Sequence, residues 1–372
     1  MRVLLINSVC GIRSTGRICT DIAEEYMAAG HQVRIAYGRE TVPAEYQSIA
    51  VSVCNKWDTY GNALKARLLD NEGFNCKRRT RTFLKWAEEY DPDLLWLHNL
   101  HGYYINVEML FDWIKSRPQM EVRWTLHDCW AFTGHCSHFS YVNCDRWKTC
   151  CEKCVQIEQY PKAYKDRSRE NYVRKKKAFC GVKNLTLIVP SKWLKKNVEK
   201  SFLKEYPIEV RYNTVDETVF KRTESDFRQK HNLEGKTIVL GVASIWTERK
   251  GLSDFVELRA MLDETYAIVL VGLTDKQAQS LPPDIICIAR TNSKQELAEI
   301  YTAADVFINP SREETFGLTT LEALSCGTPA IVYKNTACEE VINHYGNGVA
   351  VETAVSALSD AIEAVLDGRR NA

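Results

Sequence analysis

Short runs of β-branched and aliphatic residues alternate with amphipathic helical stretches along nearly the whole chain of 372 residues. This alternation is typical of βαβ units, in which helices join parallel strands, so we expect an α/β fold. The runs expected to form strands are 2–7, 32–37, 94–98, 121–126, 185–189 and 209–212 in the first half, and 237–243, 266–271, 285–289, 305–309, 330–333 and 349–351 in the second. The clearest helical stretches are 16–29, 192–202, 252–262, 293–303 and 320–325.

The series of strands starts afresh after Asp216, where Asn213 and Asp216 favour a turn. The length of the chain also suits two domains of ordinary size. We therefore expect an N-terminal domain over residues 1–216, a C-terminal domain over 217–355, and a C-terminal helix over 356–372 that packs back on the first domain. We expect both domains to be doubly wound and Rossmann-like and to face a central cleft, with ligands at the carboxyl ends of the strands.

Charge and hydropathy exclude several classes of function. The chain has 49 Lys and Arg against 48 Asp and Glu, a formal net charge of +1. A nucleic-acid-binding protein needs a basic excess, so we expect no nucleic-acid partner. The longest apolar stretch, 266–273, is too short to cross a bilayer, and the apolar part of the N-terminus is too brief for a signal peptide. We expect a cytoplasmic protein.

The most informative local pattern lies in residues 309–329, where a strand ends at Asn309 and a helix begins near Leu318. Gly317 in the intervening loop allows close approach of a ligand, and free amides at the start of a helix donate hydrogen bonds to hydroxyl or phosphate oxygens. Glu314 and Glu322 lie eight residues apart, and Glu322 can accept hydrogen bonds from both hydroxyls of a ribose.

A second loop that leads into a helix follows the first strand, at residues 9–17. Its small residues leave the start of a helix open for an anion or a sugar hydroxyl, with Gly16 at the point of approach. The spacing differs from the dinucleotide fingerprint G-x-G-x-x-G. The alternative is an ordinary helix N-cap at Ser14 or Thr15.

Several segments resemble glycosyltransferase family 4, whose members are retaining enzymes with the GT-B architecture of two Rossmann-like domains. The pattern at 309–329 is similar to the E-x7-E region of that family, and the segments 92–102, 125–136, 189–194 and 303–310 resemble members that build capsular polysaccharides and colanic-acid-type exopolysaccharides. The matches follow the same order over most of the chain, which is more specific than any single motif.

The resemblance implies roles on the donor side. Glu314 would contact the donor sugar, Glu322 the donor ribose, and Lys250 the diphosphate, where a fixed cation stabilises the charge of the leaving group. The amides of Phe316, Gly317 and Leu318 would face sugar hydroxyls or phosphate, with Gly16 nearby.

One position departs from the family pattern. Family members place an arginine six residues before the lysine, where this chain has Ser244. Arg249 stands beside Lys250 instead and is the candidate replacement, the alternative being an exposed loop charge.

The resemblance also implies a role for His127, which would contact the donor sugar or the leaving phosphate and is, with Lys250 and Glu314, a candidate catalytic residue. Asp128 follows it, and His98, Asn99 and His101 end the preceding strand, so we expect these four residues on the acceptor side.

The implied reaction is a front-face displacement in which the departing phosphate helps to deprotonate the acceptor hydroxyl, with no cofactor required for catalysis. Glu314 as a covalent nucleophile is the alternative. The expected partners are a nucleotide-sugar donor, UDP first and GDP second, and a saccharide or lipid-diphosphate-linked acceptor. Two other readings are a GT-B-fold nucleotide-sugar epimerase and a non-catalytic nucleotide-sugar-binding protein, which the serine at position 244 favours.

Residues 129–164 have neither a helical nor a strand period and contain the pattern C-x7-C-x6-C-x2-C at Cys136, Cys144, Cys151 and Cys154. Four thiolates suit a structural zinc, so we expect either a zinc site or buried reduced thiols. Disulfides are a third alternative, disfavoured in a reducing compartment.

A basic run at residues 167–177 is followed by further lysines up to Lys200, with Trp193 and Phe202 among them. This pattern indicates either a surface that meets anionic lipid on the cytoplasmic face of the inner membrane or a solvated helix face.

Overall fold

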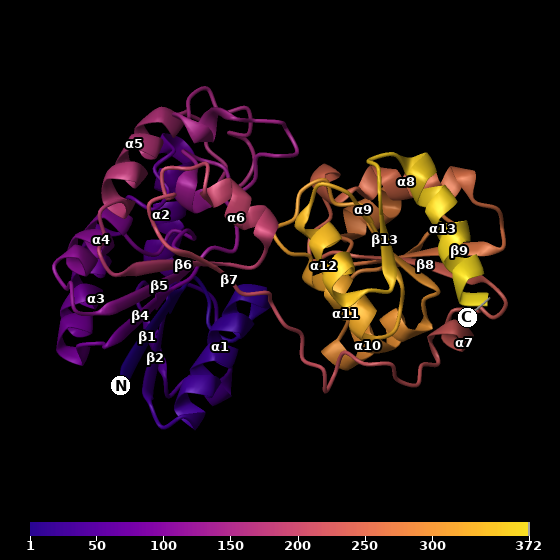
Figure 1. Ribbon diagram of the computed structural model, residues 1–372, viewed down its shortest axis with the longest axis horizontal. Helices are drawn as coiled ribbons and strands as arrows, with labels where there is room; N and C mark the ends of the chain where they lie inside the picture. The colour runs from indigo at the N-terminus through magenta and orange to yellow at the C-terminus, as the bar shows by residue number, and fades with distance from the viewer. Residues whose placement is uncertain (371–372) are drawn as a thin grey trace. The chain divides into compact units, whose positions relative to one another are not determined.

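The computed structural model describes residues 1–370 and consists of two compact units, Met1–Arg211 and Tyr212–Ala372 (Figure 1). The sequence had placed the boundary slightly later, after Asp216. Each unit contains one parallel sheet with helices, which confirms the expected α/β class.

The sheet of the first unit has seven strands in the order β3-β2-β1-β4-β5-β6-β7, all parallel. Its strands are β1 (Arg2–Asn7), β2 (Gln32–Tyr37), β3 (Ala50–Ser52), β4 (Leu94–Leu97), β5 (Glu121–Thr125), β6 (Leu185–Val189) and β7 (Ile208–Val210). Its helices are α1 (Arg13–Ala28), α2 (Lys56–Leu69), α3 (Lys77–Tyr90), α4 (Val107–Lys115), α5 (Ser168–Phe179) and α6 (Lys192–Val198), with 3-10 turns η1 (Ala44–Tyr46), η2 (Trp130–Phe132) and η3 (Arg146–Lys148).

The sheet of the second unit has six parallel strands in the order β10-β9-β8-β11-β12-β13. Its strands are β8 (Thr237–Val242), β9 (Tyr266–Val271), β10 (Ile286–Ile288), β11 (Val306–Asn309), β12 (Ala330–Tyr333) and β13 (Gly348–Val351). Its helices are α7 (Phe227–Lys230), α8 (Leu252–Met261), α9 (Asp275–Ser280), α10 (Lys294–Ala303), α11 (Leu318–Ser325), α12 (Ala337–Tyr345) and α13 (Val355–Arg370), with the 3-10 turn η4 (Glu248–Lys250).

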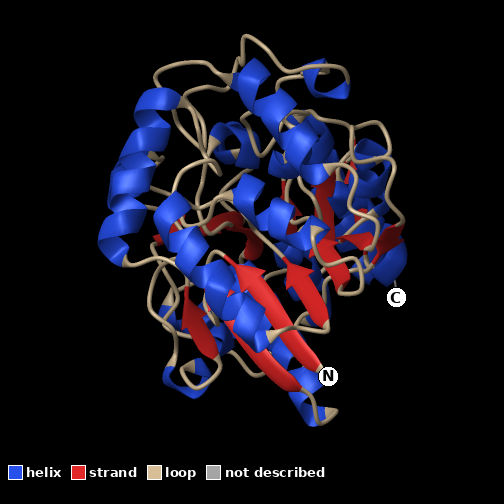
Figure 2. Cartoon of the chain, turned by 90° about the vertical axis from the view of Figure 1, so that its left-hand side faces the viewer, coloured by secondary structure: helices blue, strands red, loops and turns tan. Residues whose placement is uncertain are grey.

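Helices pack against the sheets (Figure 2), and the central strands are apolar on both sides, as strands are when both faces of a sheet are covered. In β1, Leu4 and Ile6 belong to one apolar core and Val3 and Leu5 to another, so alternate side chains enter opposite layers. This arrangement explains why the strands are continuous apolar runs in the sequence.

The C-terminal helix differs from expectation. Leu358 and Ile362 of α13 lie fully buried in the same core as Val239 of β8 and Ile331 of β12. The helix therefore completes the second unit, whereas the sequence had suggested that residues 356–372 pack back on the first domain. Among residues 1–370, no helix is long and apolar enough to cross a membrane.

Each sheet has a point where the strand order reverses, between β1 and β4 in the first unit and between β8 and β11 in the second. At such a point the loops after the two strands run in opposite directions and leave a crevice that binds ligands in doubly wound folds. The predicted site residues follow these strands: His98 and His101 come after β4, Lys250 after β8 and Glu314 after β11.

Candidate functional site

The second unit brings Lys250 and Glu314 together in an ion pair. Lys250 ends η4 after β8, and Glu314 lies in the loop after β11, the neighbouring strand across the point of reversal. Less than a quarter of either side chain is exposed. The Ser311 hydroxyl lies 3.4 Å from the same Glu314 oxygen. A cation and a carboxylate are thus held at the carboxyl edge of the sheet, where a ligand is expected.

The two loops approach each other closely at Gly251, which follows Lys250. Gly251 has a φ of 73°, and a Cβ added there would lie 2.6 Å from the carbonyl oxygen of Pro310. Only glycine therefore fits, because a side chain would be strained and would also collide with main chain.

Arg249 forms two hydrogen bonds with the backbone of the neighbouring loop. Its guanidinium donates a hydrogen bond of 2.7 Å to the carbonyl of Glu313, and its own carbonyl accepts one of 2.9 Å from the amide of Arg312. Ser244, at the position of the missing family arginine, is exposed. The structure thus places a half-buried guanidinium beside the Lys250 loop.

The start of α11 lacks a capping side chain. Its N-cap, Gly317, has a φ of 95°, and an added Cβ would lie 2.5 Å from the Cys338 sulfur. Phe316 is buried against Leu321 and Val341, so its side chain anchors the loop while its backbone remains at the helix start. The first amides of α11 have no side-chain oxygen as a cap and can donate to a ligand.

Glu322 lies one turn into α11 and is half-buried. Its carboxylate accepts a hydrogen bond of 2.9 Å from the hydroxyl of Tyr301, which comes from α10. Burial and the Glu322 charge raise the pKa of Tyr301 well above its usual range, so that phenol stays protonated and donates. Tyr301 is a supporting residue that the sequence did not reveal.

In the first unit, His98 and His127 form a pair at the ends of β4 and β5. The Nδ1 atom of His98 lies 3.0 Å from the Nε2 atom of His127, and the two rings stack. Burial lowers the pKa of His127 to about 4 and, with the His127 charge, lowers that of His98 well below its usual range. Both rings are therefore neutral at physiological pH, and a neutral pair shares one hydrogen bond.

His101 and Asp128 form the second polar group of this edge. His101 Nε2 lies 2.8 Å from Asp128 Oδ2, and His101 Nδ1 lies 2.9 Å from the hydroxyl of Tyr160. Burial alone would raise the pKa of Asp128, but His101 and the Trp130 amide lower it to about 2. Tyr160 belongs to residues 129–164, the cysteine-rich insert. Its contact with His101 was not predicted, because nothing in the sequence of an aperiodic segment indicates which residue an aromatic side chain will contact.

Asn99 and Gly16 have structural contacts. The Asn99 amide donates to Asn7 Oδ1 at 3.2 Å, and its carbonyl accepts from Tyr104 at 2.8 Å. Gly16 is buried in the first turn of α1, where an added Cβ would lie 3.1 Å from Val9. The helix begins at Arg13 with Ile12 as an uncapped N-cap, so the cap suggested at Ser14 or Thr15 does not exist.

Two charged residues of this edge escaped the sequence analysis. The buried carboxylate of Glu72 accepts the amides of Gly102 and Tyr103 at 2.6 and 2.9 Å and so fixes the loop after His101. The Arg39 guanidinium lies against Gly102, and its buried Nε has no hydrogen-bond partner in residues 1–370. Both residues stand in loops whose sequence has no recognisable motif.

The predicted zinc site is not assembled. Within residues 1–370, no group of three or more His, Cys, Asp or Glu side chains is placed to hold a metal ion. Cys136 and Cys154 share a hydrogen bond that raises the pKa of Cys136 and lowers that of Cys154 to about 7. Cys151 instead accepts the Gly134 amide at 3.1 Å, and Cys144 is half-buried. All four are free thiols, as in the alternative of reduced cysteines, and no disulfide forms.

Aromatic packing stabilises the insert, residues 129–164. Phe132, Phe139 and Trp147 lie in the core of the first unit, with the Trp147 ring 4.4 Å from Phe139 and 5.3 Å from Phe132. The fully buried Lys175 of α5 donates to the carbonyls of Trp130 and Thr133 at 2.7 and 3.1 Å. Burial lowers the pKa of this lysine to about 7. The aperiodic segment is thus packed by its own aromatic side chains and tied to α5 by Lys175.

Comparison with known proteins agrees with this geometry. Residues 223–372 match the family model described as glycosyl transferases group 1. Over 371 residues, the chain is 23% identical to a putative colanic acid biosynthesis glycosyl transferase, WcaC, of Escherichia coli K12, covering 95% of this chain and 88% of that protein. It is also 28% identical to an N-acetylgalactosaminyltransferase of Campylobacter jejuni named for diacetylbacillosaminyl-diphospho-undecaprenol, over 39% of each chain.

Solved structures share the fold. A structure of the Anabaena protein Alr3699/HepE in complex with UDP superimposes with a TM-score of 0.67 at 17% identity, over 99% of this chain and 91% of that one. The architecture of this chain is therefore that of GT-B proteins, as the sequence had indicated.

Proposed function

We propose that this chain, a glycosyltransferase with a group 1 domain and the GT-B fold, transfers a hexose with retention from a nucleotide-diphosphate sugar to a saccharide or lipid-linked acceptor of surface polysaccharide synthesis. The observation that carries the proposal is the Lys250–Glu314 ion pair at the point of reversal of the second sheet. A cation fixed there, beside an uncapped helix, suits a diphosphate.

Lys250 is proposed to bind the donor diphosphate and to stabilise the negative charge that grows on it as the glycosidic bond breaks. Glu314 holds the ammonium of Lys250 in position before the donor arrives and then accepts hydrogen bonds from the donor sugar. Arg249 is the second cation of the site, taking the place of the arginine that Ser244 replaces.

Glu322 is proposed to bind the ribose hydroxyls of the donor. Tyr301 uses one oxygen of the carboxylate and so fixes its direction. A carboxylate has about four acceptor positions, which leaves room for a diol. The amides of Gly317 and Leu318 at the start of α11 donate to the sugar or to phosphate.

The first unit is proposed to supply His127 at the reacting carbon and to bind the acceptor. As a neutral ring, His127 accepts or donates a hydrogen bond without repelling an oxocarbenium-like centre. His101, Asp128 and Tyr160 form a connected chain of donors and acceptors for acceptor hydroxyls. The bond between the anomeric carbon and phosphate breaks, the acceptor oxygen takes its place on the same face, and its proton passes to the departing phosphate.

Two features guide the choice of substrates. The structure that carries UDP has the same fold, which makes UDP the first donor base to test and GDP the second. The Campylobacter relative acts, by its name, on a saccharide linked through diphosphate to undecaprenol. An acceptor of that kind would place the enzyme on the cytoplasmic face of a membrane.

Calorimetric titration with UDP, GDP and the matching sugar nucleotides, on the wild type and Lys250→Ala, tests the donor site. Binding of one nucleotide that weakens in the variant supports the proposal. Absence of binding to any nucleotide would overturn it. Product analysis then separates the activities: transfer releases the nucleotide, an epimerase leaves a different sugar nucleotide, and a non-catalytic protein returns the donor unchanged.

A further inference from the structure

Helix α2 carries large apolar side chains on its solvent face. Trp57, Tyr60, Leu64 and Leu68 are 82%, 60%, 59% and 47% exposed. Their spacing of three and four residues places them in one stripe, while Thr59, Asn62 and Ala66 on the opposite side are buried in the first unit. Single exposed apolar residues are ordinary, but four in one stripe mark an interaction surface.

Basic residues border this stripe on both sides. Helical geometry places Lys56 and Arg67 along one edge and Lys65 along the other. The Lys56 ammonium lies 5.9 Å from the ring of Tyr60, and the Arg67 guanidinium lies 5.6 Å from the ring of Tyr164. An apolar centre with cationic edges is the pattern of helices that lie in a lipid interface.

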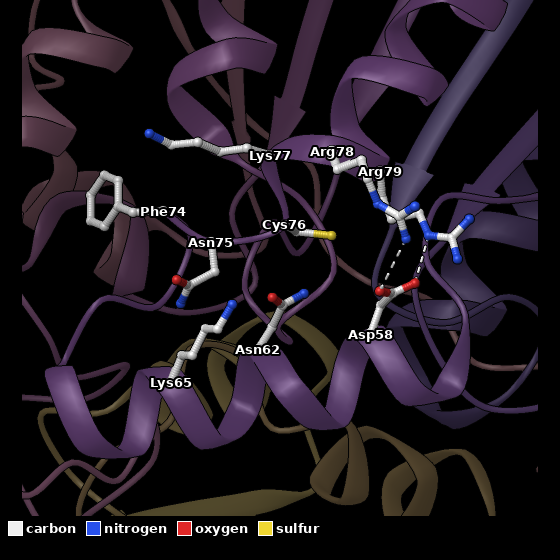
Figure 3. A pocket seen from close by; sticks show the side chains of 9 residues that line it. All are labelled: Asp58, Asn62, Lys65, Phe74, Asn75, Cys76, Lys77, Arg78 and Arg79. Atoms are coloured by element: carbon white, nitrogen blue, oxygen red, sulfur yellow. Dashed lines mark hydrogen bonds and ion pairs between the residues drawn. The ribbon is translucent and has the colours of Figure 1, made fainter.

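A cavity of about 370 Å³ opens beside the stripe, between α2 and the start of α3. Four cationic side chains line it, and Asp58 is its single carboxylate (Figure 3). Asp58 lies 2.5 Å from Arg79 and 3.9 Å from Arg78. Lys77 extends away from that carboxylate, and Lys65 points into the cavity near Asn62 (Figure 3). The cavity therefore has a surplus of positive charge and suits a phosphate.

We propose that α2 and the start of α3 dock on an anionic phospholipid bilayer. Trp57, Leu64 and their apolar neighbours enter the interface between headgroups and acyl chains, and a headgroup phosphate occupies the cavity beside Lys65 and Lys77. Apolar insertion and attraction to anionic lipid act together in such surfaces, since neither alone gives stable binding.

The basic run at residues 167–177, for which the sequence left a lipid-facing surface and a solvated helix face as alternatives, is partly neutralised within the protein. Arg167 pairs with Glu170 and Arg174 with Glu108, each with contacts of 2.7 Å. Lys175 is fully buried. Lys176 and Lys177 stay exposed, but among residues 1–370 Val173 is the one large apolar side chain that α5 exposes, so this helix lacks the apolar stripe of α2.

Membrane docking rests on the proposed function only for its biological reason, which is that a lipid-linked acceptor lies in a membrane. The structural argument for docking is independent of that function. The test of docking needs neither donor nor acceptor. Vesicle binding and nucleotide binding are measured on the same protein. A negative result with vesicles therefore contradicts only the docking proposal, and a negative result with nucleotides contradicts only the proposed function.

The test is sedimentation of the full chain with vesicles of phosphatidylcholine, with and without phosphatidylglycerol. Two double variants probe the surface, Trp57→Ser with Leu64→Ser, and Lys65→Gln with Lys77→Gln. Arg169→Gln with Lys176→Gln on α5 is the matched charge control, and Met261→Ser, exposed on α8, is the matched apolar control.

We expect binding that requires phosphatidylglycerol and weakens about thirtyfold in the lysine variant, since each surface lysine is worth about 1 kcal/mol at an anionic membrane. The apolar variant should bind as weakly, and both controls should bind as the wild type does. Brominated lipid should quench Trp57, seen as the difference between the wild type and Trp57→Phe. All variants should keep nucleotide binding.

Three results would overturn the proposal. The first is equal binding to neutral and anionic vesicles, and the second is loss of binding in the α5 control with the α2 variants unaffected. The third is binding of glycerol 3-phosphate without any binding to vesicles. If the Lys65→Gln, Lys77→Gln variant loses this binding, the cavity is the site of a soluble phosphate ligand.

Discussion

The ammonium of Lys250 is ion-paired with the carboxylate of Glu314, so the loop after β8 is tied to the loop after β11. A diphosphate that enters this site offers Lys250 a second and more highly charged partner. Under the proposed function, the pair keeps the lysine in position before the donor binds, so that its side chain does not have to be ordered during the chemical step.

Lys250→Ala should lower kcat more than it raises the KM for the donor, because the charge on the leaving group is greatest in the transition state. Loss of one electrostatic group of this kind costs about 10² to 10³ in kcat. Steady-state kinetics checks the split, with Lys250→Arg as the variant that keeps the charge. Unchanged turnover in Lys250→Ala would refute the role assigned to Lys250.

Glu322→Ala should weaken nucleotide binding by about tenfold to a hundredfold, the range for hydrogen bonds to a charged group. Calorimetry with the preferred nucleotide measures the loss. Tyr301→Phe removes only the hydrogen bond to Glu322 and should have a smaller effect on affinity. If both variants bind the nucleotide as tightly as the wild type, Glu322 does not contact the ribose.

His127 should make the protein less stable in acid. Its folded pKa of about 4 lies below the ordinary 6.5, so only the unfolded chain takes up a proton between these values. The contribution of the neutral His127 ring to the free energy of unfolding is fully present above pH 6.5. It is lost as the pH falls to about 4, and the loss is at most about 3 kcal/mol.

Chemical unfolding of the wild type and His127→Gln, above pH 6.5 and near pH 4, measures this effect. The variant should lose less stability on acidification, although His98 still contributes. The same substitution at His31, outside the pair, is the control. A wild type and a His127→Gln variant with parallel pH profiles would show that His127 is not buried as a neutral ring.

Trp147→Ala should reduce the free energy of unfolding by about 3 to 5 kcal/mol, because it empties the aromatic core of the insert. Cys144→Ser, at a half-buried thiol, should cost less than about 1 kcal/mol. Denaturant unfolding with and without a zinc chelator checks both. A large loss in Cys144→Ser together with a lower midpoint in chelator would restore the zinc interpretation.

The central strands of both sheets were predictable because those strands are buried on two faces and appear as apolar runs, as 2–7 and 237–243 do. Short or half-exposed elements were missed: β3 has three residues, and α2 carries its apolar residues toward solvent, so its periodicity does not point to a core. Residue propensities and hydrophobic periodicity report only local preference. Short or half-exposed elements depend on tertiary contacts, so these local signals do not predict them.

The donor-side residues were predictable because they cluster within short segments that resemble a family. The partners that fix them were not, since Tyr301 and Tyr160 are distant in sequence from Glu322 and His101. The packing of the insert was not predictable for a related reason: spacing along the chain does not determine which side chains meet, and the rings of Phe139 and Trp147 lie 4.4 Å apart there.

Gly251 leaves no room for a side chain between its own loop and the carbonyl of Pro310. The distance between the Lys250 and Glu314 loops is therefore set by contact between their backbones and does not depend on side-chain rotamers. Under the proposed function, this backbone contact in the second unit sets the width that is available to the donor diphosphate.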